Sequence, residues 1–256
     1  DELKVEHRYT VINGFSGELT KEGLNELANN PDVERIEYDR QVRIALDTSV
    51  AQIEANVVWN QQISGTNVTG ADETVCIVDT GVDYNHTNLG ADCFGNNNCT
   101  VIGGYDYVSD DAYPDDDNGH GTHIAGNIAS NHSTYKGVAP DTKIIAIKVL
   151  NSAGSGSTSD VVAGINWCKN NASTYNISVI SLSLTLVDGN LDEIIYTSAC
   201  DGEDSVVNAA NSAGAAGVFV VAAAGNDGNV TGIGSPACGS NVTAVGGVTG
   251  ADATIY

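Results

Sequence analysis

Methionine is absent from this 256-residue chain, and basic residues are few. The 10 Lys and Arg stand against 33 Asp and Glu, which gives a formal net charge of -23. A surface this acidic repels the phosphates of nucleic acids and of anionic lipids, so we expect neither as a partner. No apolar run reaches the length of a membrane-spanning helix, so the sequence also predicts no membrane span.

A signal peptide is also missing, because the chain begins at Asp1 with a charged, polar stretch. We therefore expect a piece of a longer, secreted and extracellular protein whose export signal lies outside these residues. Asn-x-Ser/Thr motifs, which can carry glycans in secreted proteins, favour the same interpretation, although a chain merely rich in these residues would also contain several. They begin at Asn67, Asn85, Asn98, Asn131, Asn171, Asn176, Asn229 and Asn241.

No C-x-x-C pair occurs among the six cysteines, so a zinc ribbon or a thioredoxin-type site is not expected. Cys93 and Cys99 bracket a short polar loop and are predicted to form a disulfide. The second predicted disulfide joins Cys200 to Cys238. Cys76 lies inside an apolar stretch and is expected to be a buried thiol.

Aromatic residues are scarce, whereas glycine and aliphatic residues are common, as in α/β proteins with tight turns. From residue 74 onward, apolar strands alternate with helices, which predicts a mostly parallel sheet with helices on both faces, in three layers. The predicted strands are residues 74–79, 101–108, 143–150, 179–186, 218–224 and 242–245. The composition of residues 151–159 is typical of a flexible linker.

The first 46 residues are predicted to form a separate small α+β domain, with residues 47–256 as the main domain. A strand from Lys4 to Phe15, a short helix capped by Thr20 and an extended stretch from Val33 to Ile44 make a β-α-β unit. So small a unit is marginal alone and needs a partner surface.

Three polar residues occupy positions suited to acyl-transfer chemistry. Asp79 ends a buried strand, His120 opens a helix between two glycines, and Asn226 stands in a glycine turn after another buried strand. A buried carboxylate can orient a histidine and stabilise its protonated form. A side-chain amide on a tight turn can donate to a developing oxyanion.

At these residues the chain resembles the subtilisin-like serine proteases. The matching motifs are V-D-T-G-V-D from Val78, H-G-T-H-I-A-G from His120, A-A-A-G-N from Ala222 and G-V-A-P from Gly137. The resemblance implies a serine endopeptidase that acts on proteins or peptides as a monomer. It assigns the triad aspartate to Asp79, the triad histidine to His120 and the oxyanion donor to Asn226, roles established in that family rather than worked out from this chain.

The resemblance also implies a substrate cleft and an inhibitor for it. Two backbone segments would flank the substrate, Gly154-Ser155-Gly156 and Ser183-Leu184-Thr185, and the specificity pocket would be walled by Ala223, Ala224 and Gly225. Thr185 stands where relatives usually have glycine, so the pocket entrance is expected to be narrower. The first 46 residues would be part of an inhibitory propeptide, cleaved near Leu46.

The acidic loop before His120 has two interpretations. By the resemblance, Asp106, Asp111 and Asp115 fall where some relatives bind calcium, and clustered oxygen ligands on an irregular loop suit that ion. The alternative is a solvated acidic loop. A zinc site at His120 and His123 is a third, disfavoured alternative, because no H-E-x-x-H motif is present.

The nucleophile of the implied triad has no counterpart among the serines of this chain. The family's G-T-S-M-A motif follows the oxyanion asparagine, and no such motif occurs in residues 1–256. Two hypotheses follow: the chain is a fragment of a longer protease, which is favoured, or it is an inactive relative that acts as a binding or inhibitory protein.

Overall fold

The computed structural model describes residues 3–8, 15–33, 36 and 50–247. The chain divides into two compact units, residues 1–44 and 45–256, and each is described by itself.

The N-terminal unit contains a two-stranded antiparallel sheet and one helix. Strand β1 (Leu3–Arg8) pairs with β2 (Phe15–Leu19), and α1 (Lys21–Ala28) follows. The prediction of one continuous strand from Lys4 to Phe15 is therefore wrong. Residues 9–14, which connect the two strands, lie outside the described part of the chain.

Helix α1 begins where the sequence predicts it. The Thr20 hydroxyl accepts a hydrogen bond from the backbone N–H of Gly23 at 3.1 Å, which satisfies one free donor of the first turn. The predicted extended stretch from residue 33 to 44 falls mainly on residues 34–35 and 37–44, outside the described part of the chain.

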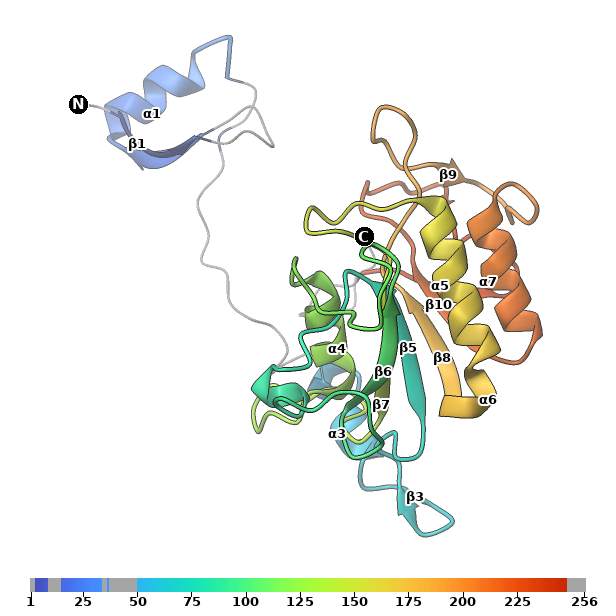
Figure 1. The fold of residues 1–256 in the computed structure, drawn as a ribbon. Helices are drawn as coiled ribbons and strands as arrows, with labels where there is room; N and C mark the ends of the chain where they lie inside the picture. Colours follow the sequence, from blue (N-terminus) through green and yellow to red (C-terminus); the bar gives the residue numbers. More distant parts are fainter. Residues whose placement is uncertain (1–2, 9–14, 34–35, 37–49, 248–256) are drawn as a thin grey trace. The chain divides into compact units, whose positions relative to one another are not determined.

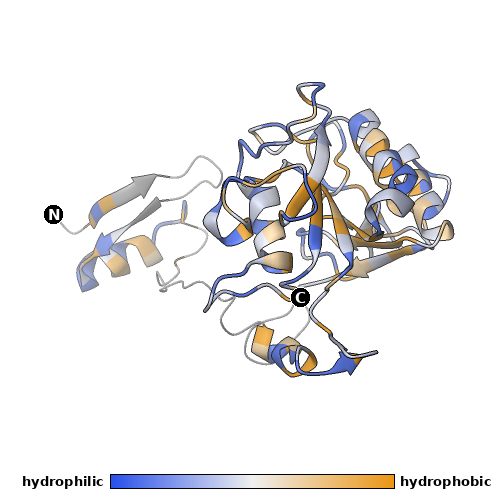
Figure 2. Cartoon of the chain, turned by 60° about the horizontal axis from the view of Figure 1, so that its bottom comes forward, coloured by the Kyte–Doolittle hydropathy of each residue, from blue (hydrophilic) through white to orange (hydrophobic). Residues whose placement is uncertain are grey.

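The main unit is built on a six-stranded parallel sheet with strand order β12-β10-β8-β5-β7-β6 (Figure 1). Its strands are β5 (Thr74–Asp79), β6 (Val101–Asp106), β7 (Lys143–Lys148), β8 (Ile177–Leu182), β10 (Phe219–Ala223) and β12 (Val242–Val245). The four central strands read as nearly continuous apolar runs because helices cover both of their faces (Figure 2).

Helices lie on both faces of this sheet, which confirms the predicted three-layer α/β architecture. Helix α4 (His120–Ala129) covers one face, and α5 (Thr158–Asn170) and α7 (Ser205–Ala215) cover the other (Figure 1). Alternate strand residues enter the two cores: Ile77 packs on the α4 side and Val78 on the α5 side. Burial of each such side chain contributes about 1.5–3 kcal/mol.

Short elements complete the unit at its edges. They are α3 (Ala55–Val58), β3 (Gln62–Ile63), β4 (Thr66–Asn67), η1 (Thr87–Leu89), α6 (Ala172–Tyr175), β9 (Ile195–Tyr196) and β11 (Ile233–Gly234).

All six cysteines form disulfides. The predicted pairs Cys93–Cys99 and Cys200–Cys238 are confirmed. The expectation of a buried thiol at Cys76 is wrong, because Cys76 in β5 is bonded to Cys168 in α5. The two residues are 92 positions apart and meet only because α5 packs across β5, a contact that no local pattern in the sequence reveals.

Residues 151–159 form a tight turn and a helix start rather than a linker. The Asn151 side chain accepts hydrogen bonds from the backbone of Ala153 and Ser155, and Leu150 pairs with Gly156 in an isolated bridge. A Cβ at Gly156 would lie 2.1 Å from the Val149 carbonyl oxygen, so this turn requires glycine there. Ser157 caps α5.

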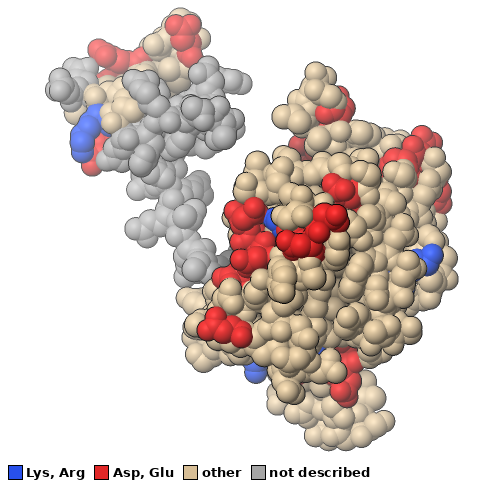
Figure 3. All heavy atoms as spheres, viewed as in Figure 1, with Lys and Arg blue, Asp and Glu red and all other residues tan. Residues whose placement is uncertain are grey.

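The excess of acidic over basic residues in the sequence is also seen on the surface of the main unit. On the face drawn in Figure 3, Asp and Glu side chains gather over the centre of the main unit, and Lys and Arg are sparse. Within the described residues, no helix has the length and apolar character that crossing a bilayer requires.

Candidate active site

The predicted site residues follow strands that end at one edge of the sheet. Asp79 is the last residue of β5, Ser183 comes directly after β8, and Ala223 is the last residue of β10. Because all these strands are parallel, their carboxyl ends meet at the same edge, where α/β proteins place their ligands.

Asp79 and His120 are in direct contact at this edge. The Asp79 Oδ1 atom lies 2.7 Å from His120 Nδ1. The aspartate side chain is 1% exposed, whereas the histidine side chain is 46% exposed. Because Nδ1 donates to the carboxylate, Nε2 is the ring nitrogen that remains available for a reacting group.

Burial controls the charge of this pair. Burial raises the pKa of Asp79, and the hydrogen bonds from His120 and from the backbone N–H of Thr80 only partly offset it. The second carboxylate oxygen, Oδ2, is buried without a hydrogen-bond partner among the described residues. Because this buried carboxylate has few hydrogen bonds, its negative charge is stabilised most when the imidazole beside it becomes positively charged.

The two glycines that flank His120 have different roles. A Cβ at Gly121 would lie 2.1 Å from the Gly81 carbonyl oxygen, so only glycine lets the helix start approach the turn after β5. Gly119 instead has open space around it and a φ of 106°, a left-handed conformation that favours glycine.

Asp116 holds the turn that presents His120, and the sequence analysis did not single it out. Its Oδ1 accepts from the backbone N–H groups of Asn118 and Gly119, and its Oδ2 accepts from the backbone N–H and hydroxyl of Thr122. The hydroxyl of Thr80, next to Asp79, also donates to Oδ1 at 2.8 Å. This carboxylate therefore ties the end of β5 to the first turn of α4.

The same bonds determine the charge of Asp116. Burial acts to raise the pKa of this carboxyl, but the bonds from Gly119, Thr122 and Asn118 outweigh it, and the net pKa is lowered. The only sequence signal was a run of three aspartates, residues 115–117, which did not distinguish this member from its neighbours.

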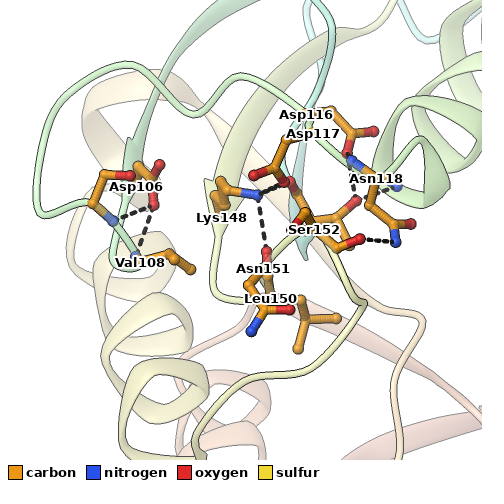
Figure 4. A network of polar contacts seen from close by, with 12 residues as sticks. Asp106, Val108, Asp116, Asp117, Asn118, Lys148, Leu150, Asn151 and Ser152 are labelled. Atoms are coloured by element: carbon orange, nitrogen blue, oxygen red, sulfur yellow. Dashed lines mark hydrogen bonds and ion pairs between the residues drawn. The ribbon is translucent and has the colours of Figure 1, made fainter.

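Lys148 is a second residue that the sequence analysis missed. It ends β7, and its side chain is 3% exposed. Its ammonium group donates to the Thr80 carbonyl at 2.7 Å. It also donates to Asp117 Oδ1 at 2.5 Å and to the Leu150 carbonyl at 2.9 Å (Figure 4). A lysine that ends an otherwise apolar strand was the available signal.

The turn before His120 also contacts the predicted substrate segment. The Asn118 side-chain amide donates to the Ser152 carbonyl at 3.0 Å (Figure 4). The exposed segment Gly154-Ser155-Gly156 comes directly after this contact. Through Lys148 and Asn118, the end of β5, the histidine turn and this segment form one hydrogen-bonded network.

The predicted oxyanion residue lies on the far side of β8. Asn226 is exposed, three residues beyond the end of β10, and β8 separates β10 from β5. The ends of β5 and β10 are thus two strand spacings apart, about 10 Å along the sheet edge. The oxyanion role stays a prediction, as do the roles of Gly154–Gly156, Ser183–Thr185 and Ala223–Gly225.

The predicted pocket wall contacts two residues that the sequence analysis did not include. The Glu193 Oε1 atom accepts from the backbone N–H of Asn226 at 3.0 Å, and its Oε2 lies 2.3 Å from the position that a Cβ on Gly225 would take. Gly234 donates its N–H to the Ala224 carbonyl at 3.1 Å. No motif in the sequence marks Glu193.

The three predicted calcium ligands do not form a metal cage. Asp106 Oδ1 accepts from Val108 and Ser109 within its own loop, and Asp111 Oδ1 accepts from Tyr113. Among the described residues, no group of three or more His, Cys, Asp or Glu side chains is placed to bind a metal ion. The three aspartates are therefore not arranged as a calcium cage in this structure.

Comparison with known proteins gives two family matches. Residues 70–255 match the model of the subtilase family, and residues 1–45 match that of peptidase inhibitor I9.

Individual relatives agree with these matches. The serine protease AprX of Bacillus subtilis is 34% identical over 95% of this chain and 53% of its own length. Subtilisin DY of Bacillus licheniformis is 39% identical over 77% of this chain and 62% of its own. A solved structure of a cold-adapted subtilisin-like serine proteinase superposes with a TM-score of 0.56 at 31% identity, over 76% of this chain and 62% of that one. The chain thus spans less than two thirds of these relatives.

Proposed function

Because this chain belongs to the subtilase family, we propose that it is part of a secreted serine endopeptidase that is made as an inactive precursor. The observation that carries the proposal is the 2.7 Å contact between the buried Asp79 carboxylate and the half-exposed His120 ring. An acid–histidine pair at the carboxyl edge of a parallel sheet, with a predicted oxyanion donor following a strand that ends at the same edge, suits acyl transfer.

Each residue has one task in this reaction. His120 Nε2 accepts the proton of a serine hydroxyl as the serine oxygen bonds to the substrate carbonyl carbon. Asp79 keeps the ring in position and stabilises the positive charge that forms on it. The Asn226 side-chain amide donates to the oxyanion. His120 then returns the proton to the leaving amine, and water releases the acyl group by the same route in reverse.

The nucleophilic serine is the part of this proposal that lies outside residues 1–256, since none of the serines here stands in the family's motif. The coding sequence beyond residue 256 is expected to contain that motif. A fluorophosphonate probe should label the full-length gene product at one serine, and the His120→Ala variant should not be labelled. An absence of labelling in the unaltered protein would refute the protease function.

The N-terminal unit is proposed to act as an intramolecular inhibitor that the enzyme removes near Leu46. The match of residues 1–45 to peptidase inhibitor I9 supports this role. N-terminal sequencing of the secreted product is expected to find a mature end close to residue 47. The His120→Ala precursor should keep its N-terminal unit, and efficient cleavage of that variant without added protease would exclude self-processing.

Secretion is proposed from the three disulfides, which persist in oxidising compartments. Seven of the eight Asn-x-Ser/Thr asparagines are exposed, and only Asn171 is half-buried, with its amide donating to the Trp167 carbonyl. If the protein is exported through a glycosylating pathway, glycosidase treatment followed by mass spectrometry should find glycans at exposed sites and none at Asn171.

Calcium binding to the acidic loop is a separate proposal, taken from the family resemblance. Its support is crowding of negative charge: burial and then the charge of Asp83 raise the pKa of Asp115, and a cation would relieve this repulsion. Calcium titration with thermal melting should raise the Tm, whereas Asp115→Asn should reduce that shift. An unchanged Tm in the unaltered protein would eliminate the site.

A further inference from the structure

Glu193 lies in the segment between β8 and β9, outside every motif of the family resemblance. Its carboxylate nevertheless reaches the turn that carries the predicted oxyanion residue. Oε1 accepts from the backbone N–H of Asn226, and Oε2 lies against the Cα of Gly225, where any larger residue would collide with it. The carboxylate is therefore part of the wall that Ala223, Ala224 and Gly225 are predicted to form.

Thr185 brings a second polar group to the same wall. Its Oγ1 lies 2.4 Å from the position that a Cβ on Gly234 would take, and the Gly234 N–H donates a hydrogen bond to the Ala224 carbonyl. A Cβ at Gly225 or at Gly234 would meet a polar side-chain atom from the segment that follows β8, and Gly225 also has a left-handed φ of 115° that favours glycine. Glu193 thus contacts Gly225 directly, whereas Thr185 reaches the wall through Gly234.

Both groups carry an oxygen that lacks a partner. Among the described residues, only three buried side-chain polar atoms have no hydrogen bond: Asp79 Oδ2, Glu193 Oε2 and Thr185 Oγ1. One belongs to the proposed catalytic pair, and the other two lie on the predicted pocket wall. Native proteins leave few such atoms, because an unpaired buried carboxylate oxygen is costly, so two at one wall point to a partner that the described residues do not supply.

We propose that Glu193 and Thr185 make this pocket selective for a substrate lysine or arginine at the residue whose carbonyl is attacked. This inference rests on the proposed protease function. The contact with Asn226 determines which substrate residue meets Glu193. The Glu193 carboxylate is hydrogen-bonded to the turn that would hold the oxyanion, which forms from the attacked carbonyl. The substrate side chain next to that carbonyl is therefore the one that meets Glu193.

The chemistry of the partner follows from the two oxygens. An ionised carboxylate only accepts hydrogen bonds, and a hydroxyl can accept one as well, so the partner must present several donors and a positive charge. Lysine and arginine do so on a long apolar stem. A leucine or phenylalanine at this position would leave both oxygens buried without partners, and this cost disfavours apolar substrates. Such a penalty discriminates between substrates more strongly than apolar contacts alone can.

The test uses the full-length gene product and succinyl-Ala-Ala-Pro-X-p-nitroanilide substrates with X as Arg, Lys, Leu or Phe. The unaltered enzyme is expected to show a higher kcat/KM for Arg and Lys than for Leu and Phe. Glu193→Gln keeps an oxygen that can accept from Asn226 but removes the charge. This variant should lower the ratio of kcat/KM for Arg over Leu by about 10- to 100-fold. Thr185→Val should lower the same ratio by a smaller factor.

Glu203→Gln is the matched control, because Glu203 is an exposed acid of the same region and the exchange should leave the ratio unchanged. A purely structural Glu193 would predict an equal loss of kcat/KM for all four substrates, and that result would overturn the inference. So would a preference of the unaltered enzyme for Leu or Phe, with the protease function intact. Failure of fluorophosphonate labelling together with no hydrolysis of any substrate would refute the protease function, and with it this inference.

Discussion

Replacement of Asp116 by alanine should destabilise the protein and displace His120 at the same time. The side chain accepts five hydrogen bonds, from the backbone N–H groups of Asn118, Gly119 and Thr122 and from the hydroxyls of Thr80 and Thr122, at distances of 2.6 to 3.0 Å. Helix α4 has no side-chain cap of its own at Gly119, so this carboxylate satisfies backbone N–H donors around its first turn that have no partner within the helix.

The expected loss of stability depends on which of these donors water can reach once the carboxylate has been removed. Asn118 and Gly119 are exposed, so water can replace most of what their N–H groups lose in hydrogen bonding. Thr80 is fully buried and Thr122 is half-buried, and bonds from such donors to a charged acceptor contribute about 1.5–3 kcal/mol each before discounting for solvent screening of the half-exposed carboxylate. We therefore expect Asp116→Ala to lower the free energy of unfolding by about 3 kcal/mol.

The sign of the pH dependence gives an independent check. The pKa of Asp116 is lowered in the folded state, so its contribution is present above the unfolded value of 3.8 and is lost as pH falls through the folded pKa. The stability difference between Asp116→Ala and the unaltered protein should thus be constant near neutral pH and shrink below about pH 4.

Urea unfolding under non-reducing conditions, followed by circular dichroism at several pH values, measures both quantities. Asp141→Ala is the control, because Asp141 is exposed and the change should cost less than about 0.5 kcal/mol. A cost for Asp116→Ala no larger than that of the control, or a cost that grows in acid, would refute the argument.

Three further perturbations test other parts of the structure. Lys148→Met should lower the free energy of unfolding by about 3–4 kcal/mol, because the buried Thr80 carbonyl, the half-buried Leu150 carbonyl and Asp117 lose their cation; urea unfolding with a loss below about 1 kcal/mol would contradict this. Asp79→Asn should raise the Tm, because burial raises the pKa of Asp79 and the neutral amide avoids a buried charge. In the full-length enzyme the same change should lower kcat on the order of 10⁴-fold, the cost known for the triad aspartate of subtilisin; a lowered Tm or an unchanged kcat would count against this pairing. Removal of the Cys76–Cys168 disulfide by replacing both residues with alanine should cost about 4 kcal/mol, since it closes a long loop, and an unchanged urea midpoint would show that the bond contributes nothing.

The predicted and observed bounds of an element agree best where a local pattern in the sequence defines that element. Strands buried on both faces leave continuous apolar runs, so β5 begins and ends at the predicted residues 74–79. Local capping chemistry located the start of α1 at Thr20 equally well. Composition was a poor guide for residues 151–159, because Gly and Ser suit both a flexible linker and a tight turn closed by side-chain hydrogen bonds.

The sequence alone determined the parallel α/β architecture, because strand and helix periodicity, turn residues and apolar runs are local properties. It also determined that an aspartate, a histidine and an asparagine follow strands or open helices at one sheet edge. Only the tertiary structure decided which other polar groups support them. Asp116, Lys148, Glu193 and the partner of Cys76 acquire their roles from contacts with segments 6 to 92 residues away, and no local pattern encodes such contacts.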